Sequence, residues 1–406
     1  MNLAYFIAKR ISQQQKAGFS ATIHKIAIVS ICLGLAAAIV SFLIMHGFQE
    51  AVKKKMYSFS GHLVVNALSY NNSLEETPFS FNIPLYNDPT QFEGVQQVQE
   101  YAHKTGLLKT EEEILGVVVK GVSKRFDTLA FDETMVEGRF IHFPDSAVAN
   151  EVVISRVIAN KMKLKTGDDL IVHFFQNPPR FRKLRITGIY ETNLSEYFDG
   201  KMIISDLRMV QRLNDWGDSL AGGLEVYVKD VSQTDVIGQN IHDAIDYDLQ
   251  VTSTAFKYQQ VFQWLDLINR QVNILLVIIL TVICINMISI VLILVMERTQ
   301  MIGMLKAMGA TNRLIRNIFI SNGIDLVVRG LLWGNVLALS LCYIQYQFRL
   351  IPLNAHDYYI AYVPIAWHWD VILFLNLLVF IVVSVVLLLP TAVIARINPI
   401  KAIKFD

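Results

Sequence analysis

Four long apolar stretches constrain the fold of this chain more than any other feature. A helix needs roughly 20 apolar residues to cross the hydrocarbon core of a bilayer, which is about 30 Å thick. The stretches that reach this length are 26–45, 272–296, 371–394 and, with Asp325 and Arg329 inside it, 317–348. Only 17% of all residues are charged, against about 25% in a typical soluble domain. The sequence therefore predicts membrane spans rather than one large soluble core.

Basic residues in the short segments beside these stretches predict the orientation. Residues 1–25 contain four basic residues and no acidic one, and segment 297–316 contains four basic residues against Glu297. Short loops that stay in the cytoplasm are enriched in lysine and arginine. We therefore expect both termini and segment 297–316 to be cytoplasmic, and residues 48–270 to lie across the membrane from them.

The predicted fold class is an α-helical membrane protein with four transmembrane helices plus a large α+β extracytoplasmic domain. The expected segments are an N-terminal amphipathic segment (1–25), a first transmembrane helix (26–47), the outer domain with stalk helices (48–270), a second transmembrane helix (271–296), a cytoplasmic helix (297–316), a third transmembrane helix (317–348), a short outer loop (349–369), a fourth transmembrane helix (370–394) and a cytoplasmic tail (395–406).

The outer domain is expected to mix strands and helices. Short runs rich in valine and isoleucine, which are typical of strands, are 63–67, 114–122, 151–155, 170–175, 184–190, 202–205 and 224–228. Helices are expected at 156–164 and 207–213, and the segments 47–56 and 254–270 should prolong the first two spans as a stalk. The three cysteines (Cys32, Cys284 and Cys342) all lie in apolar stretches, which excludes a disulfide framework in this domain.

A proline-rich loop, QNPPRFRK (176–183), separates two of the predicted strands. Pro178 and Pro179 remove backbone donors and stiffen the turn. One interpretation is an ordinary hairpin loop. The other is a rigid projecting loop that binds a partner, with Phe175 and Phe181 supplying apolar contact area.

Small and charged residues inside the spans each allow two interpretations. Gly34, Ala37 and Ala38 permit close packing of helices, or they leave room for acyl chains at a lipid-facing patch. Asp325 and Arg329 are four residues apart, which suits a helical ion pair. Ionisable residues within a span are also candidates for a functional role.

Segment 297–315, ERTQMIGMLKAMGATNRLI, predicts a short amphipathic helix. Met301, Leu305 and Met308 recur with helical spacing, and Gly309 suits a left-handed C-cap. Thr311 is suited to cap the next helix. The helix either lies on the membrane surface or offers its apolar face to a groove in a partner, where methionine adapts well to repacking.

The chain lacks the sequence patterns of common catalytic sites. No G-x-x-x-x-G-K-[ST], G-x-S-x-G, H-E-x-x-H or C-x-x-C run occurs, and the nine histidines are scattered. We therefore expect no catalytic residue, no metal site and no enzyme activity in this chain. A net charge of +1 gives no electrostatic case for nucleic acid.

Several of these segments resemble a known family. ERTQMIGMLKAMGAT resembles the E-R-x-x-E-I-G-x-L-K-A-x-G-A segment of FtsX-like ABC permeases, with Met301 in place of the usual acid. Residues 19–50 resemble the first span of the LolC/LolE-type lipoprotein-releasing permeases, with His46 in place of asparagine in the M-N-G-F turn. Segments 351–364 and 389–406 resemble stretches of the same permeases, and 136–213 is similar to part of a MacB-type periplasmic core.

The resemblance implies a location and a set of partners. The location is a bacterial inner membrane, with the outer domain in the periplasm. The protein partners are two copies of a separate ATP-binding subunit, which holds ATP and Mg²⁺, and a second permease, either a paralogue or the same chain. The other partners are membrane lipids, a lipoprotein substrate and a periplasmic lipoprotein carrier. It implies ATPase coupling for Glu297, Arg298, Met301, Gly303, Leu305, Lys306, Gly309 and Ala310. It also suggests that Pro178, Pro179 and Phe181 contact the carrier.

Two other functions stay open from the sequence. One is MacB-like mechanotransmission for efflux or secretion, although such chains usually carry their own ATPase. The other is FtsX-like signalling that activates a cell-wall hydrolase, although such proteins have a smaller outer domain.

Overall fold

The computed structural model describes residues 19–69, 75–110, 113–145 and 147–391. The chain forms two compact units. The helical unit comprises 1–50, 264–352 and 363–406, and the α+β unit comprises 51–263 and 353–362. Expectations for the N-terminal segment before residue 19 and for the tail after residue 391 fall outside the described residues.

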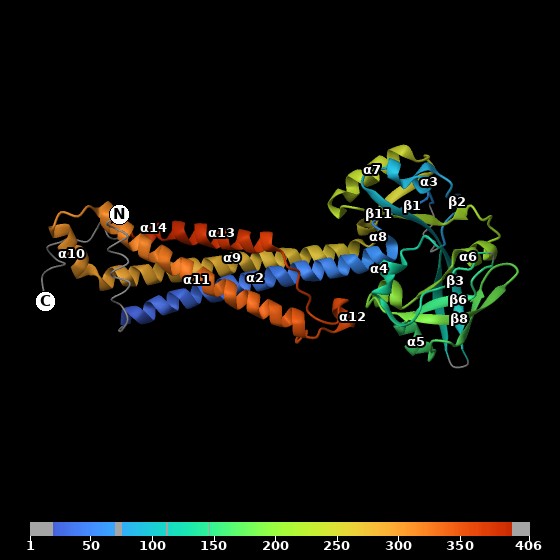
Figure 1. The fold of residues 1–406 in the computed structure, drawn as a ribbon, viewed down its shortest axis with the longest axis horizontal. Helices are drawn as coiled ribbons and strands as arrows, with labels where there is room; N and C mark the ends of the chain where they lie inside the picture. Colours follow the sequence, from blue (N-terminus) through green and yellow to red (C-terminus); the bar gives the residue numbers. More distant parts are fainter. Residues whose placement is uncertain (1–18, 70–74, 111–112, 146, 392–406) are drawn as a thin grey trace. The chain divides into compact units, whose positions relative to one another are not determined.

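Four helices in the described residues are long and apolar enough to cross a membrane, which confirms the predicted set (Figure 1). They are α2 (Phe19–Ser60), α9 (Gln259–Glu297), α11 (Asn312–Phe348) and α13 (Trp369–Val386). The shorter α10 (Thr299–Ala307) connects α9 to α11, and α14 (Leu388–Thr391) follows α13. Because α2 continues to Ser60 and α9 begins at Gln259, one stalk helix is longer and the other shorter than expected.

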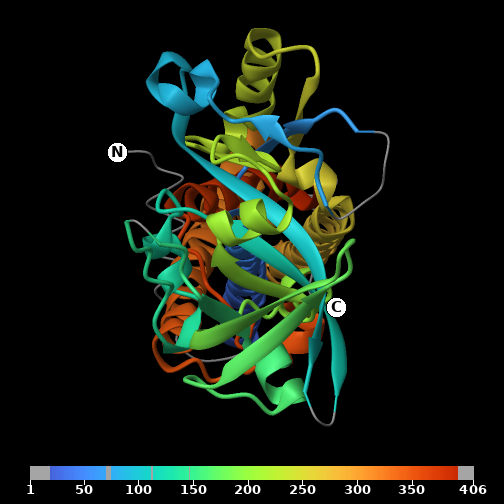
Figure 2. The ribbon, with the colours of Figure 1, turned by 90° about the vertical axis from the view of Figure 1, so that its right-hand side faces the viewer.

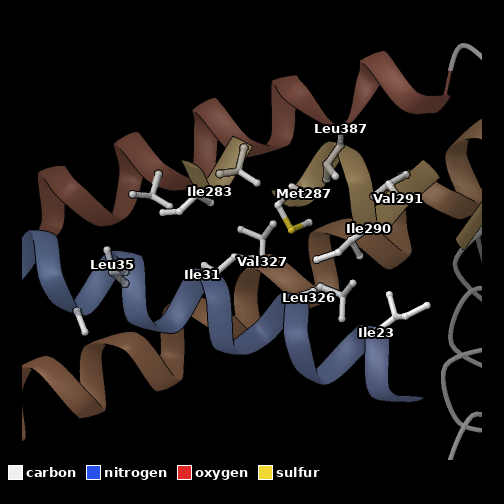
Figure 3. Close-up of a cluster of buried hydrophobic side chains, with 14 of the residues drawn as sticks. Ile23, Ile31, Leu35, Ile283, Met287, Ile290, Val291, Leu326, Val327 and Leu387 are labelled. Carbon is white, nitrogen blue, oxygen red and sulfur yellow. The ribbon is translucent and has the colours of Figure 1, made fainter. Parts of the chain in front are cut away.

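The core of the helical unit is built from all four long helices. Figure 3 shows Ile31 of α2, Met287 of α9 and Val327 of α11 converging on one another, and all three are buried. Close packing depends on glycine at one crossing, since a Cβ on Gly330 of α11 would lie 2.6 Å from the Cβ of Ile31. Small residues allow helix backbones to approach in this way inside a membrane.

The α+β unit contains a ten-stranded sheet with order β12-β1-β11-β3-β4-β9-β6-β8-β5, in which β7 pairs with both β3 and β8. Its strands are β1 (Leu63–Ala67), β3 (Val95–Lys109), β4 (Ile114–Val122), β5 (Met135–Gly138), β6 (Glu151–Ser155), β7 (Asp169–Phe174), β8 (Arg180–Tyr190), β9 (Met202–Asp206), β11 (Gly223–Val228) and β12 (Leu249–Ser253). β2 (Phe79–Ser80) and β10 (Leu220–Ala221) form a separate pair.

The pairings of β7 close six strands into a ring. The circuit runs β3-β4-β9-β6-β8-β7 and returns to β3 through the pairs Leu107 with His173 and Leu108 with Val172. Alternate residues of β7 are buried and exposed, as expected for a strand with one face toward a core. The buried residues of the ring, such as Val119, Val172 and Ile186, form one hydrophobic cluster.

Short helices complete the unit (Figure 2). They are α3 (Pro84–Asn87), α4 (Thr128–Asp132), α5 (Arg156–Met162), α6 (Leu207–Leu213), α7 (Thr234–Ala244), α8 (Thr254–Lys257) and α12 (Ala355–Tyr358), with single turns at Pro89–Gln91, Ser195–Asp199 and Val231–Gln233. α7 covers the part of the sheet made by β1 and β12, where Gly238 contacts Leu63.

The seven predicted strands and two predicted helices of this unit are present, with ends that differ by a few residues. β8 differs most, because it begins at Arg180 rather than Leu184. Strands β3, β5 and β12 and helix α7 were not expected. The long strand β3, cyan in Figure 2, pairs with β11, β4 and β7.

Candidate coupling segment and partner-binding surfaces

The segment between α9 and α11 folds as a capped short helix, as the sequence predicts. At the end of α10, Ala310 N donates to Leu305 O (2.9 Å) and Gly309 N donates to Lys306 O (3.0 Å). This is the double hydrogen-bond pattern of a Schellman cap, and Gly309 has the positive φ of 87° that it requires. Thr311 then caps α11, since its Oγ1 accepts from Leu314 N (3.3 Å).

The exposed face of α10 differs from the expected one. Ile302 and Gly303 are buried, and Met301 and Leu305 pack half-buried against the helical core. The exposed methionines are Met304 (54% exposed) and Met308 (76%). Of the predicted apolar face, Met301 and Leu305 are thus half-buried and Met308 is exposed, and its contact with a partner stays a prediction. The periodicity was correct, but Ile302 draws the neighbouring face toward the core.

The other predicted coupling residues are divided between surface and interior. Glu297 and Gly309 are exposed, whereas Arg298, Lys306 and Ala310 are half-buried. The Nε atom of Arg298 is buried without a hydrogen-bond partner among the described residues. An unsatisfied buried donor is costly, and the coupling role of Arg298 stays a prediction.

The small residues of the first span serve mainly to pack helices. A Cβ on Gly34 would lie 2.5 Å from the Cδ1 atom of Ile283 in α9, and Ala38 is only 1% exposed. Ala37 is exposed. The expectation of a lipid-facing patch is therefore wrong for Ala38, and of the three residues only Ala37 presents an exposed side chain.

The predicted ion pair within the third span is present. Arg329 Nη2 lies 2.8 Å from Asp325 Oδ2, and both side chains are about half exposed within this chain. A single charge within a span is costly to hold in lipid. Because the two residues lie on the same helix, each charge is balanced without a contact from a neighbouring helix. Its functional role stays a prediction.

The proline-rich loop is short and firmly held. Because β8 begins at Arg180, the loop contains only residues 175–179, and Phe181 is a strand residue opposite His173. Arg180 forms an ion pair with Asp215 (2.9 Å), and Gln176 Nε2 donates to Leu213 O (2.9 Å). These contacts fix the hairpin to the end of α6.

The tip of this hairpin exposes aromatic surface. Phe175 is 74% exposed and Phe181 is 63% exposed. Exposed aromatic side chains on a fixed hairpin can enter a partner's pocket at little entropic cost. Pro178 and Pro179, which lie between them in the loop, are exposed as well.

A buried lysine was missed by sequence reasoning. Lys120 of β4 is 1% exposed, and its Nζ donates to Phe59 O (2.5 Å), near the end of α2, and to Glu225 Oε1 (2.6 Å) on β11. The Nζ atom also lies 5.1 Å from the centre of the Phe59 ring. Burial lowers the pKa of Lys120, and the Glu225 carboxylate opposes that shift by stabilising the ammonium form. The signal in the sequence was one lysine inside the run VVVKGV.

Together, the four spans and the ten-stranded α+β unit define a membrane protein with a large domain inserted between its first two spans. Residues 26–244, more than half of the chain, match the model of the MacB-like periplasmic core domain, and residues 273–399 match the model of the FtsX-like permease C-terminal region. The chain belongs to the FtsX-like permeases that carry a MacB-like periplasmic core, the membrane subunits that pair with ABC ATPases.

Full-length relatives are distant. The chain is 23% identical over 395 residues to the lipoprotein-releasing system transmembrane protein LolE of Haemophilus influenzae, covering 92% of this chain and 93% of the relative. It is 21% identical over 386 residues to the corresponding LolC protein of Neisseria meningitidis serogroup B, covering 90% and 88%. Among solved structures, the periplasmic region of MacB from Actinobacillus actinomycetemcomitans covers 50% of this chain and 93% of that chain at 13% identity, with a TM-score of 0.35.

Proposed function

We propose that this chain is the permease subunit of an ABC complex that releases lipoproteins from the inner membrane of a bacterium. The observation that carries the proposal is the extent of similarity to LolE and LolC proteins. It covers about nine-tenths of both chains, whereas each family segment by itself covers only part of this chain. A chain that shared only the membrane architecture would match over the permease segment alone.

The α10 segment supports the assignment of an ATPase partner. No phosphate-binding G-x-x-x-x-G-K-[ST] run occurs in the 406 residues, so the proposal places ATP and Mg²⁺ on a separate subunit. The exposed Met304 and Met308 supply adaptable apolar contacts for that subunit. Two copies of the ATPase would then serve a pair of permeases, formed by this chain with itself or with a paralogue.

The hairpin of β7 and β8 supports the assignment of a carrier-binding surface. Phe175 and Phe181 are exposed, and the ion pair of Arg180 with Asp215 holds their positions. A soluble carrier that accepts a lipoprotein must dock reversibly, and a small fixed apolar surface suits such a transient contact.

Orientation is the first requirement of the proposal. We expect a membrane-impermeant maleimide added to whole cells, with the outer membrane permeabilised, to label a Phe181→Cys variant and to spare a Met308→Cys variant. Both side chains are well exposed, so reactivity would report the side of the membrane. Labelling of the Met308→Cys variant alone would reverse the orientation and remove the proposal.

Depletion tests the function itself. When the protein is depleted, outer-membrane lipoproteins should accumulate in inner-membrane fractions, while a lipoprotein that normally stays in the inner membrane serves as the control. Unchanged lipoprotein sorting would rule out this function. Loss of efflux, or loss of cell-wall hydrolase activation, would then support one of the other two family functions.

A further inference from the structure

The α+β unit contains a cavity that neither the coupling segment nor the aromatic hairpin uses. Its volume is 340 Å³, which lies within the size range of small-molecule sites. Residues of β3, β4, β12 and α8 contribute to its wall, together with Lys201 and Met202 at the start of β9. β3, β4 and β9 are consecutive in the sheet order, whereas β12 is its edge strand.

The two acidic residues of the cavity are already engaged. Glu75 accepts from Lys104 Nζ (2.9 Å) and from Thr105 N (3.0 Å). Glu76 accepts from His103 N (3.0 Å) and contacts His103 Nδ1 (2.5 Å). Burial raises the pKa of each carboxyl, but these hydrogen bonds and nearby positive charges outweigh it and lower the pKa overall. Both are therefore carboxylates whose charge is largely balanced by protein partners.

Three nitrogen-bearing side chains of the cavity wall are His103, Lys201 and Lys257. His103 Nε2 is buried and has no hydrogen-bond partner among the described residues. The Nζ atoms of Lys201 and Lys257 form no ion pair within the described part of the chain, and Lys257 lies 5.9 Å from the centre of the Tyr258 ring. Because the Glu76 carboxylate can only accept, His103 Nδ1 carries the proton of that contact, and Nε2 is left without a partner among the described residues. The ammonium groups of Lys201 and Lys257 supply the positive charge that suits an anion.

We infer that this cavity binds a phosphate group, carried by a ligand of about the size of glycerol phosphate. The ammonium groups of Lys201 and Lys257 can each donate to the oxygen atoms of a phosphate. The cavity is larger than inorganic phosphate needs, and Met202, Val118 and the Tyr258 ring provide apolar wall for a short carbon chain. The inference goes beyond the proposed transport function and does not depend on it.

The position of Tyr258 links this cavity to the end of a long helix. Tyr258 Oη lies 3.3 Å from the Oγ atom of Ser60, the last residue of α2. Tyr258 also precedes the start of α9 at Gln259. An occupant would therefore touch the residue at which both stalk helices meet the sheet.

Isothermal titration of the purified full-length protein in nanodiscs of phosphatidylcholine tests the inference. We expect sn-glycerol 3-phosphate to bind and glycerol to give no heat. Lys201→Gln and Lys257→Gln should each weaken binding about tenfold or more, because each removes one charge-assisted contact. Lys229→Gln is the matched control, since Lys229 is exposed like Lys257 and lies outside the cavity. Its affinity should stay within twofold of the parent protein.

Two further arms separate the sources of the phosphate. Tighter binding of glycerol phosphate than of inorganic phosphate supports a lipid head group. In that case, lipid mass spectrometry of the protein purified from its membrane should detect a bound anionic phospholipid, and the Lys201→Gln/Lys257→Gln double variant should lose it. Equal binding of the two probes supports a site for free phosphate. Absence of heat at millimolar glycerol phosphate, or unchanged affinity in both lysine variants, would overturn the inference.

Discussion

Replacing Lys120 with methionine should destabilise the α+β unit strongly. The side chains of Lys120 and Glu225 are 2% and 4% exposed, so water cannot compensate for a lost partner. Removing one member of a buried ion pair typically costs about 3–5 kcal/mol, since the remaining charge stays buried. Here Glu225 would keep only the hydrogen bond from Gln99 Nε2 (2.8 Å), and Phe59 O would lose its donor. We therefore expect a loss near that range.

Native-state hydrogen exchange of the full-length protein is the appropriate measurement, because it reports opening free energies for separate segments. Amides of β4 and β11 should lose about 3–5 kcal/mol of protection in Lys120→Met. The double variant Lys120→Met/Glu225→Leu should recover most of that loss, because well-packed apolar residues commonly replace a buried pair at little cost. The difference between single and double variants gives the coupling energy.

Lys124→Met is the matched control for this prediction. It makes the same change four residues later, where Lys124 pairs with Asp145 at the surface and the side chains are 53% and 96% exposed. Exposed pairs contribute about 0–1 kcal/mol. Should Lys120→Met cost no more than Lys124→Met, the reasoning about the buried pair would be refuted.

Three further variants test other parts of the structure. Burial lowers the pKa of His62 to about 4, so the free energy of unfolding should fall by about 1–2 kcal/mol as pH drops from about 6.5 toward 4, after allowance for partial exposure. Equilibrium unfolding of His62→Gln should lack this pH dependence, and the same dependence of the unfolding free energy on pH in the variant would contradict the prediction. Gly309→Ala should reduce transport per ATP hydrolysed in the reconstituted complex, because φ is 87° there and an L-residue in this left-handed conformation costs about 1–2 kcal/mol. Gly167→Ala, with φ of 96° in the α+β unit, is the control, and an equal loss of transport in both variants would remove the coupling role. Phe181→Asp should abolish co-purification with the periplasmic carrier while Tyr247→Asp, at a residue 98% exposed, does not; retained co-purification would exclude the hairpin.

The sequence predicted those helices and strands whose apolar residues follow a regular local pattern. The spans follow from length and apolarity. The helix expected at 207–213 is present, and the structure shows that the Asp206 side chain accepts from Arg208 N (3.0 Å) at its N-cap. Strand β3 was missed because Gln99, Glu100 and Lys104 interrupt its apolar pattern. All three are buried. Gln99 and Lys104 find partners on segments distant in the sequence, Glu225 for Gln99 and Glu75 for Lys104.

The candidate surfaces show the same limit. Helical spacing identified an apolar face on α10, but only the packing of Ile302 determines that Met304 and Met308 remain exposed while Met301 does not. Likewise the cavity beside His103 draws residues from elements between 66 and 258, and no spacing rule relates them. A sequence shows which side chains carry charge, whereas the fold determines which charges are already balanced.

The length of α2 restricts how proteins of this architecture can diverge. Its 42 residues make an uninterrupted rod of about 63 Å, roughly twice the thickness of the hydrocarbon core. One inserted residue would turn everything beyond it by about 100° and advance it by about 1.5 Å. Seven inserted residues would leave the angular register within about 20°. Homologues that keep this fold should therefore gain or lose about seven residues at a time in this helix, which is two turns. An alignment that places a single-residue gap between Ile23 and Phe59 is suspect.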